Sequence, residues 1–254
     1  MIRTKTNANK NLQNTRIIRY DVTDSTNTRA REYAKENAPD SPVVFIAEAQ
    51  SAGRGRRGRS FDSSAGAGIY ISFLMPVGDC QKDAASITAN AAVKLCRVLE
   101  EFFGISAGIK WVNDIYVNDR KLAGILAESV LSDSGEIKYY ICGIGINIFK
   151  RIFPDEIKEI AITVEEIIAK KPDKAGFLNA MLAEFLSDEK EEDFISEYRR
   201  KSILIGEEIT AHLFSGDSFS ATVLDVGDGA ELIVKTEDGK IKSLISAEVS
   251  VRKK

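Results

Sequence analysis

The chain has 254 residues, of which 44% are hydrophobic and 29% are charged, and its formal net charge is −3. This size and composition are typical of a globular protein with one large domain, alone or beside a small one. The slightly acidic balance argues against a general nucleic-acid-binding protein, which carries a basic excess over a whole face. Three scattered cysteines and a single histidine, His212, argue against a disulfide framework, a zinc site and histidine-based acid–base chemistry.

The chain divides into a tail and two folded parts. Residues 1–15 are polar and lack apolar periodicity, so we expect a flexible tail. Helical and strand patterns alternate over residues 16–202 and predict an α+β domain with a mixed or antiparallel sheet and flanking helices. Four short strand patterns separated by turns follow in residues 203–254, and they predict a small β-barrel packed against the first domain. No secretory segment or membrane-spanning apolar run occurs, so we expect a cytoplasmic protein without a membrane partner.

The elements of the α+β domain follow from their patterns. Asp24 or Ser25 is expected to cap a helix, and "PVVFIAEA" and "AGIYISFLM" are typical of buried strands. Residues 83–103 predict a long amphipathic helix. The run "AGIKWVNDIYVNDRKLAGILAESV" predicts strands joined by a tight turn at "NDR", and "KYYICGIGINI" predicts a further strand. Helices are expected at "TVEEIIAK" and over residues 173–200.

The stretch "SAGRGRRGRSF", residues 51–61, concentrates arginines and glycines. Its spacing Gly53-x-Gly55-x-x-Gly58 matches a dinucleotide-binding turn, but a loop and then a strand are predicted after it. A dinucleotide turn leads into a helix whose N-terminus holds the pyrophosphate, and a Walker loop is absent as well. Glycines let a loop approach a ligand, and arginine suits carboxylate and phosphate oxygens. An anion-binding loop and a solvated loop without a specific ligand both remain open on this stretch alone.

Two further stretches carry candidate site residues. In "KWVNDIYVNDRKLAGILAE", Lys110 and Lys121 flank Asp114, and on a hairpin the two lysines can converge to provide charges for an acyl-phosphate. Both can equally be surface lysines. In "GIGINI", residues 143–148, closely spaced glycines in a buried strand indicate close approach of a flat ligand or tight packing on a helix.

Together these blocks resemble the biotin protein ligases, also called biotin–[acetyl-CoA-carboxylase] ligases. Members share "STN", "GRGRRGR" followed by an aromatic residue, "KWPND" running into "KLAGIL-E", and "GIGIN", and all four blocks occur here in the same order. The resemblance covers residues 16–254 and implies a class II synthetase-like catalytic domain with an SH3-like C-terminal barrel. Some members carry an N-terminal DNA-binding domain. About fifteen to twenty polar residues precede the catalytic domain here, so we expect the short form, without nucleic acid as a partner.

The resemblance implies a two-step reaction. Biotin and Mg-ATP form biotinyl-5′-AMP, and a lysine of a biotin carboxyl carrier protein or domain then attacks this mixed anhydride. The expected small molecules are therefore biotin, ATP and Mg²⁺, and the expected partner is the carrier, with a homodimer as one expected assembly. The alternatives are a lipoate-type ligase, which uses the same acyl-adenylate logic, and a nucleic-acid-binding module that uses the arginine loop.

The family's site residues carry over to the positions that match its motifs. Biotin contacts are implied for Ser25, Thr26, Asn27, Gln50, Gly53, Arg54, Gly55, Arg56, Lys121, Gly124 and Gly143. ATP or adenylate contacts are implied for Arg54, Arg56, Phe61, Lys110, Asn113, Lys121 and Asn147. Catalytic roles are implied for Arg56, Lys110, Asp114 and Lys121, and no metal-binding cluster of side chains is expected. Phe61 stands where relatives have tryptophan and Val112 where they have proline, and both departures bear on ligand affinity.

The chemistry of acyl activation agrees with these roles. Attack of a carboxylate on the α-phosphate is opposed by the repulsion of two anions, and cations held near both relieve it. Each charge-assisted hydrogen bond of this kind is worth about 1.5–3 kcal/mol. The attacking amine belongs to the acceptor protein, so the reaction needs no histidine of the enzyme.

Overall fold

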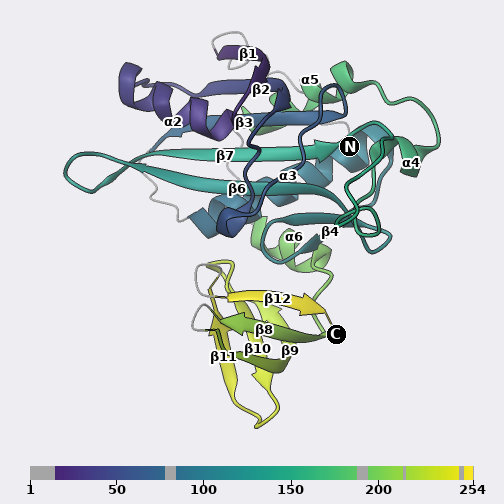
Figure 1. Ribbon diagram of the computed structural model, residues 1–254. Helices are drawn as coiled ribbons and strands as arrows, with labels where there is room; N and C mark the ends of the chain where they lie inside the picture. The colour runs from purple at the N-terminus through teal and green to yellow at the C-terminus, as the bar shows by residue number, and fades with distance from the viewer. Residues whose placement is uncertain (1–14, 78–83, 188–193, 214–215, 246–248, 254) are drawn as a thin grey trace, which may run out of the picture.

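The larger part of the molecule is built on a seven-stranded sheet (Figure 1). A computed structural model describes residues 15–77, 84–187, 194–213, 216–245 and 249–253. The strands lie in the order β1-β2-β3-β7-β6-β5-β4, and β1 runs parallel to β2 while the other neighbours are antiparallel. Their bounds are β1 Arg16–Thr23, β2 Val43–Gln50, β3 Gly68–Pro76, β4 Gly108–Lys110, β5 Asp114–Val117, β6 Arg120–Leu131 and β7 Ile137–Asn147. The predicted mixed sheet with flanking helices is confirmed.

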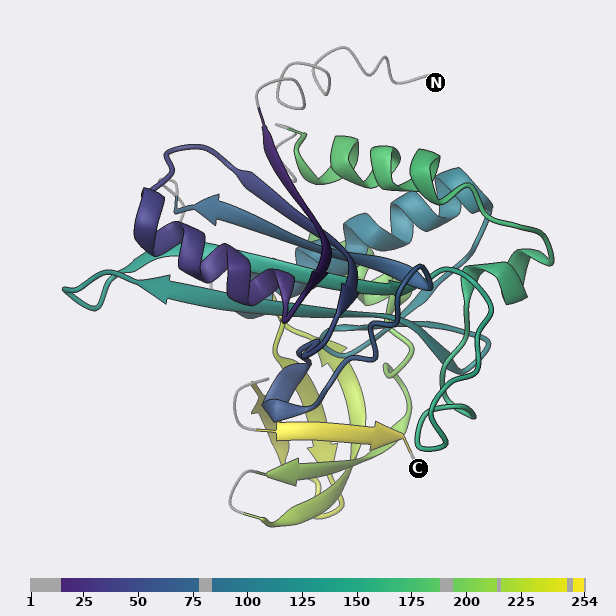
Figure 2. The same cartoon turned by 45° about the horizontal axis from the view of Figure 1, so that its top comes forward.

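Helices cover both faces of this sheet (Figures 1 and 2). On strand β2, Val43 and Phe45 belong to the cluster beneath α2, while Val44 and Ile46 belong to the core that includes α3. Alternate residues of a strand point to opposite faces, so burial of both faces explains why "VVFIA" is apolar without interruption. The helices are α2 Thr26–Asn37, α3 Ala84–Phe103, α4 Val164–Ile168, α5 Lys174–Phe185 and α6 Phe194–Lys201.

The C-terminal part is a five-stranded antiparallel sheet, and here the sequence expectation needs correction. The strands are β8 Glu208–Leu213, β9 Ser218–Val226, β10 Leu232–Thr236, β11 Ile241–Leu244 and β12 Val249–Lys253, in the order β11-β10-β9-β8-β12. The last of the four expected strands is divided into β11 and β12. Among the described residues no pairing joins these two edges, so the sheet is not the closed barrel that we expected. In β11 only Leu244 is buried, and Ile241 at the start of the strand is exposed.

The two parts pack against each other through buried and polar contacts. Trp111 Nε1 donates to the carbonyl of Ala230 at 2.8 Å, and the Arg199 guanidinium pairs with Asp228 at 2.7 Å. Ala230 also belongs to the same hydrophobic core as Trp111. Figure 1 shows the C-terminal sheet beside α6 and the edge of the large sheet that carries β4. The domain boundary at residue 203 stays a prediction, and the expected tail lies outside the described residues apart from Thr15.

No helix in the described part of the chain is both long enough and apolar enough to cross a membrane. Cys96 and Cys142 are buried thiols that form no disulfide.

Candidate active site

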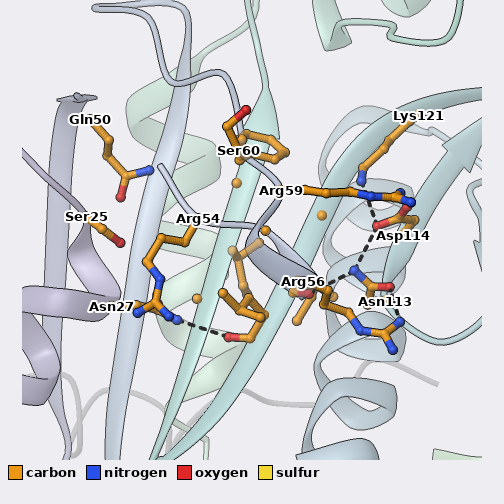
Figure 3. Close-up of a pocket in the computed structure, with 18 of the residues that line it drawn as sticks. Ser25, Asn27, Gln50, Arg54, Arg56, Arg59, Ser60, Asn113, Asp114 and Lys121 are labelled. Carbon is orange, nitrogen blue, oxygen red and sulfur yellow. Dashed lines mark hydrogen bonds and ion pairs between the residues drawn. The ribbon is translucent and has the colours of Figure 1, made fainter. Parts of the chain in front are cut away.

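One cavity of about 570 Å³ opens between the arginine loop, the start of α2, the β5–β6 hairpin and β7 (Figure 3). Most of the residues implicated by the sequence line it: Ser25, Thr26, Asn27, Gln50, Arg54, Gly55, Arg56, Phe61, Lys110, Asn113, Asp114, Lys121, Gly124 and Gly143. Two of them, Gly53 and Asn147, do not line it. Segments separated by more than a hundred residues therefore meet at one site.

The arginine loop folds back on itself as a tight turn. The amide of Gly55 donates to the carbonyl of Arg59 at 2.7 Å, and the amide of Phe61 donates to the carbonyl of Gly53 at 2.9 Å. A short 3₁₀ turn, η1 Arg56–Gly58, forms the tip of the loop. Residue 58 has φ +70°, a backbone conformation that favours glycine. The glycine spacing that resembles a dinucleotide turn thus serves a hairpin-like loop.

The loop sends Arg54 and Arg56 toward different parts of the cavity, as Figure 3 shows. The Arg54 guanidinium lies beside Asn27 and forms an ion pair with Glu128 at 3.0 Å. Arg56 Nη1 donates to Oδ1 of Asn113 at 3.1 Å. The cavity therefore has one arginine near the start of α2 and another near the hairpin.

The hairpin brings the other charged groups together. Asn118 and Asp119 both have positive φ, as the two-residue turn of a tight hairpin requires, and this turn sets Lys121 opposite Tyr116. Lys121 Nζ lies 2.8 Å from Oδ1 of Asp114, to which Asn113 Nδ2 also donates at 2.9 Å. Arg56, Asn113, Asp114 and Lys121 thus form one continuous polar network.

Lys110 and Tyr116 complete this end of the cavity. Lys110 Nζ lies 5.0 Å from the centroid of the Tyr116 ring, whose π-electrons attract the ammonium group. Burial, with the nearby Asp114 carboxylate, raises the pKa of Tyr116 to about 12, so its hydroxyl stays protonated at neutral pH. The expected convergence of Lys110 and Lys121 on one site is therefore found, because both line the same cavity.

At the other end of the cavity, uncharged polar groups lie beside the ion pair of Arg54 with Glu128. Ser25 is the N-cap residue of α2, but its side chain does not cap the helix. Instead Gln50 Oε1 accepts from the amide of Thr26 at 2.8 Å, while Gln50 Nε2 donates to Ser63 Oγ at 2.8 Å. The side chain of Gln50 is thus fixed between the helix and the end of the loop.

Protein contacts also hold the side chain of Asn27. Its Nδ2 donates to Oε2 of Glu128 at 2.8 Å, and its Oδ1 lies 2.6 Å from the buried hydroxyl of Ser72. Asn27 is 4% exposed. Its amide is therefore oriented before any ligand arrives.

The glycines of "GIGIN" leave room for side chains of the protein. A Cβ on Gly143 would lie 2.1 Å from Oδ1 of Asn27, and one on Gly145 would lie 2.4 Å from the ring of Phe61. A Cβ on Gly53 would meet the carbonyl of Phe61 at 2.3 Å. Close packing therefore accounts for these three positions. A Cβ on Gly124 would approach only the flexible end of Lys121, at 3.3 Å, and the Phe61 ring.

Asn147 lies away from the cavity wall. Its Oδ1 accepts from Arg151 Nη2 at 3.3 Å, and Arg151 also forms an ion pair with Asp62 at 2.9 Å. These contacts tie the end of β7 to the segment that follows the arginine loop. The role of Asn147 at an adenylate stays a prediction.

Sequence reasoning missed several residues of the site. Trp111, Tyr116, Arg59 and Ser60 line the cavity, and Glu128, Ser72 and Ser63 support residues that do. Glu128 closes the block "KLAGILAE", and Ser72 interrupts an apolar strand, so a polar residue within each apolar pattern was the available signal. The described residues contain no cluster of three or more His, Cys, Asp or Glu side chains placed to hold a metal ion.

Comparisons with known proteins agree on one family. Residues 20–147 match the model of the Biotin/lipoate A/B protein ligase family. The chain is 32% identical over 245 residues to the bifunctional ligase/repressor BirA of Bacillus subtilis (strain 168), which covers 92% of this chain and 74% of that protein. It is 29% identical over 219 residues to the biotin–[acetyl-CoA-carboxylase] ligase of Mycobacterium tuberculosis, which covers 83% of this chain and 79% of that protein.

A solved structure agrees with these relatives. The biotin protein ligase of Aquifex aeolicus, in complex with biotin and ATP, superposes with a TM-score of 0.78 at 28% identity, covering 94% of this chain and 99% of that one. The fold and the cationic cavity, with these matches, define a ligase. The chain belongs to the biotin/lipoate A/B protein ligase family. The resemblance to biotin protein ligases seen in the sequence is thereby confirmed.

Proposed function

We propose that the chain activates biotin with ATP to biotinyl-5′-AMP and transfers the biotinyl group to a lysine of a biotin carboxyl carrier protein or domain. The observation that carries this proposal is the polarity of the cavity. At one end Gln50 and Thr26 supply neutral hydrogen-bonding groups, and the Arg54 cation there is paired with Glu128. The network of Arg56, Asp114 and Lys121 forms the other end. A neutral ureido ring joined to a carboxylate matches that arrangement.

In the first step a carboxylate oxygen of biotin bonds to the α-phosphorus of ATP, and the bond from that phosphorus to the pyrophosphate oxygen breaks. Both reactants are anions, so the step needs cations at the point where they meet. Lys121 and Arg56 line that end of the cavity and can lie against the α-phosphate. In the second step the acceptor amine bonds to the biotinyl carbonyl carbon, AMP leaves, and the amine loses its proton to solvent or to AMP.

The donor set of the cavity bears on Mg²⁺. Asp114 is the carboxylate that lines the cavity in the described part of the chain, and Asn113 supplies an amide beside it. Mg²⁺ in nucleotide sites commonly takes one or two protein carboxylates and completes its shell with phosphate oxygens and water. Asp114 therefore fits as its protein ligand, with ATP phosphates as the others. The bound ion would neutralise charge on the pyrophosphate.

Incubation with biotin, Mg-ATP and a purified carrier domain tests the proposal. We expect the mass of the carrier to rise by one biotinyl group, only when ATP is present, and not when its target lysine is replaced by arginine. A carrier that is left unmodified with biotin, but gains a lipoyl group when lipoate replaces biotin in the incubation, would favour the lipoate-type alternative. Homodimer formation and a cytoplasmic location stay predictions.

A further inference from the structure

A single carboxylate, that of Glu128 on β6, joins the arginine loop to helix α2 beside the cavity. Its Oε1 pairs with Arg54 at 3.0 Å and with Arg31 at 3.0 Å, and its Oε2 accepts from Asn27 at 2.8 Å. The Glu128 side chain is 15% exposed. Glu128 itself does not line the cavity, whereas Arg54 and Asn27 do. The carboxylate therefore acts on the cavity through these two neighbours.

The two arginines around Glu128 differ in how firmly they are held. Arg31 also donates to the carbonyl of Ser129 at 3.0 Å, so it joins α2 to β6 twice. Arg54 lies on the loop, and its side chain is 46% exposed against 30% for Arg31. Arg54 is thus the partner that can leave and return with the loop, while Arg31 and Asn27 keep the carboxylate in place.

We propose that Glu128 is a positioning residue for the vitamin: its carboxylate draws Arg54 across the Asn27 end of the cavity and so holds the arginine loop closed over the bound ring. The proposal rests on the proposed function, because it assigns the ring to that end. The same carboxylate also fixes the amide of Asn27. Glu128 therefore positions both Asn27, which lines the ring site, and Arg54, whose loop covers it.

The chemistry of the contacts requires a carboxylate at this position. All three neighbours present N–H donors, and they use both oxygens of Glu128. A glutamine has one oxygen and an NH₂ group, so its NH₂ would face either the Asn27 NH₂ group or the two guanidinium groups. An aspartate is shorter by one methylene. Neither substitution can preserve all three contacts: glutamine lacks the second acceptor oxygen, and aspartate lacks the length.

The main test is Glu128→Gln in the full chain, assayed by biotin-dependent ATP–pyrophosphate exchange. Loss of a charge-assisted contact predicts about a tenfold rise in the KM for biotin and in the release rate of biotinyl-adenylate. The kcat should change by less than about threefold, because Lys121 and Arg56 are untouched. Trypsin should also cleave the arginine loop faster in this variant, both without ligand and with biotin.

Three further variants separate positioning from a general structural role. Glu48→Gln is the matched control, because Glu48 pairs with Lys174 at 2.7 Å and neither residue lines the cavity. Arg54→Gln should reproduce the rise in KM and add little to Glu128→Gln, while Arg31→Gln should leave the KM within about twofold. An unchanged KM in Glu128→Gln, or an effect reproduced by Arg31→Gln and not by Arg54→Gln, overturns the proposal.

Failure of the proposed function can be distinguished from failure of the proposal for Glu128. It appears as absence of biotin-dependent exchange in the unsubstituted chain, whatever the variants do. If that chain activates another acid, the KM ratios of the variants for that acid still decide the role of Glu128. If Glu128→Gln unfolds, Glu128→Asp takes its place, because aspartate keeps the charge but is too short to reach Arg54, Arg31 and Asn27 together. An unchanged KM for biotin in Glu128→Asp overturns the proposal.

Discussion

The ammonium group of Lys121 lies 2.8 Å from Oδ1 of Asp114, its neighbour across the β5–β6 hairpin. The Lys121 and Asp114 side chains are 28% and 24% exposed, so this pair forms part of the cavity wall and still meets solvent. Under the proposed function, the carboxylate keeps the cation inside the cavity until a ligand anion takes its place. The Lys121 charge is thus oriented before substrate binds, which lowers the cost of arranging it during the reaction.

Replacement of Lys121 by alanine should lower biotin-dependent ATP–pyrophosphate exchange by about a hundredfold or more. Loss of two charge-assisted contacts of about 1.5–3 kcal/mol each, one to the biotin carboxylate and one to the α-phosphate, corresponds to that range. Lys174→Ala is the control, since Lys174 pairs with Glu48 outside the cavity. Exchange that is equal in Lys121→Ala and Lys174→Ala would remove Lys121 from the catalytic machinery.

Alanine at Gly143 should destabilise the protein more than alanine at Gly124. The added Cβ at Gly143 would lie 2.1 Å from Asn27, whose amide is held by Glu128 and Ser72 and cannot easily move. Overpacking of this kind costs about 1–3 kcal/mol. At Gly124 the contact is with the flexible end of Lys121, so a cost below about 1 kcal/mol is expected. Urea unfolding of both variants measures the difference, and equal losses would contradict the packing argument.

Replacement of Trp111 by phenylalanine should weaken the contact between the two sheets. The indole donates to the buried carbonyl of Ala230, and phenylalanine leaves that acceptor unpaired, at a cost of about 1–3 kcal/mol in the free energy of unfolding. Because Trp111 lines the cavity, the KM for ATP should rise as well. Tyr33→Phe is the control, since it removes only an exposed contact with Arg16. Equal unfolding free energies for the two variants would argue against a role for the indole.

Stability should decline at alkaline pH because of two buried thiols. Burial raises the pKa of Cys96 and of Cys142 to about 12, above the ordinary value of 9.0. The unfolded chain therefore loses these protons first, so the contribution is complete below about pH 9 and is lost as pH rises toward 12. Chemical unfolding between pH 8 and 11 measures the decline. It should be shallower in Cys142→Ala, and an unchanged slope would exclude this cause.

The sequence was most informative where one pattern had a single structural solution. Successive residues of β2 are buried in the cores on opposite faces of the sheet, as its uninterrupted apolar run predicts. The two-residue turn at Asn118 and Asp119 follows in the same way from turn chemistry. The edge strand β1 was not singled out, because "RIIRYDVT" is only partly buried and mixes polar with apolar residues. The barrel was overpredicted because strand patterns do not show whether the two edges of a sheet meet.

The site shows a similar division. Most of the residues taken from the shared motifs line one cavity. Adjacency in the loop could not show that Arg54 and Arg56 reach different partners, Glu128 and Asn113. Nor could spacing show that the glycine at 143 accommodates Asn27. Both facts depend on contacts between distant segments, which only the folded chain supplies.

The measurement that bears most directly on the central claim is ATP–pyrophosphate exchange by the unsubstituted chain with biotin, lipoate or octanoate as the only acid. The polarity of the cavity predicts Mg²⁺-dependent exchange with biotin, and at most a small fraction of that rate with lipoate or octanoate. Exchange supported equally by all three acids, or by none of them, would contradict the assignment of this cavity to biotin activation.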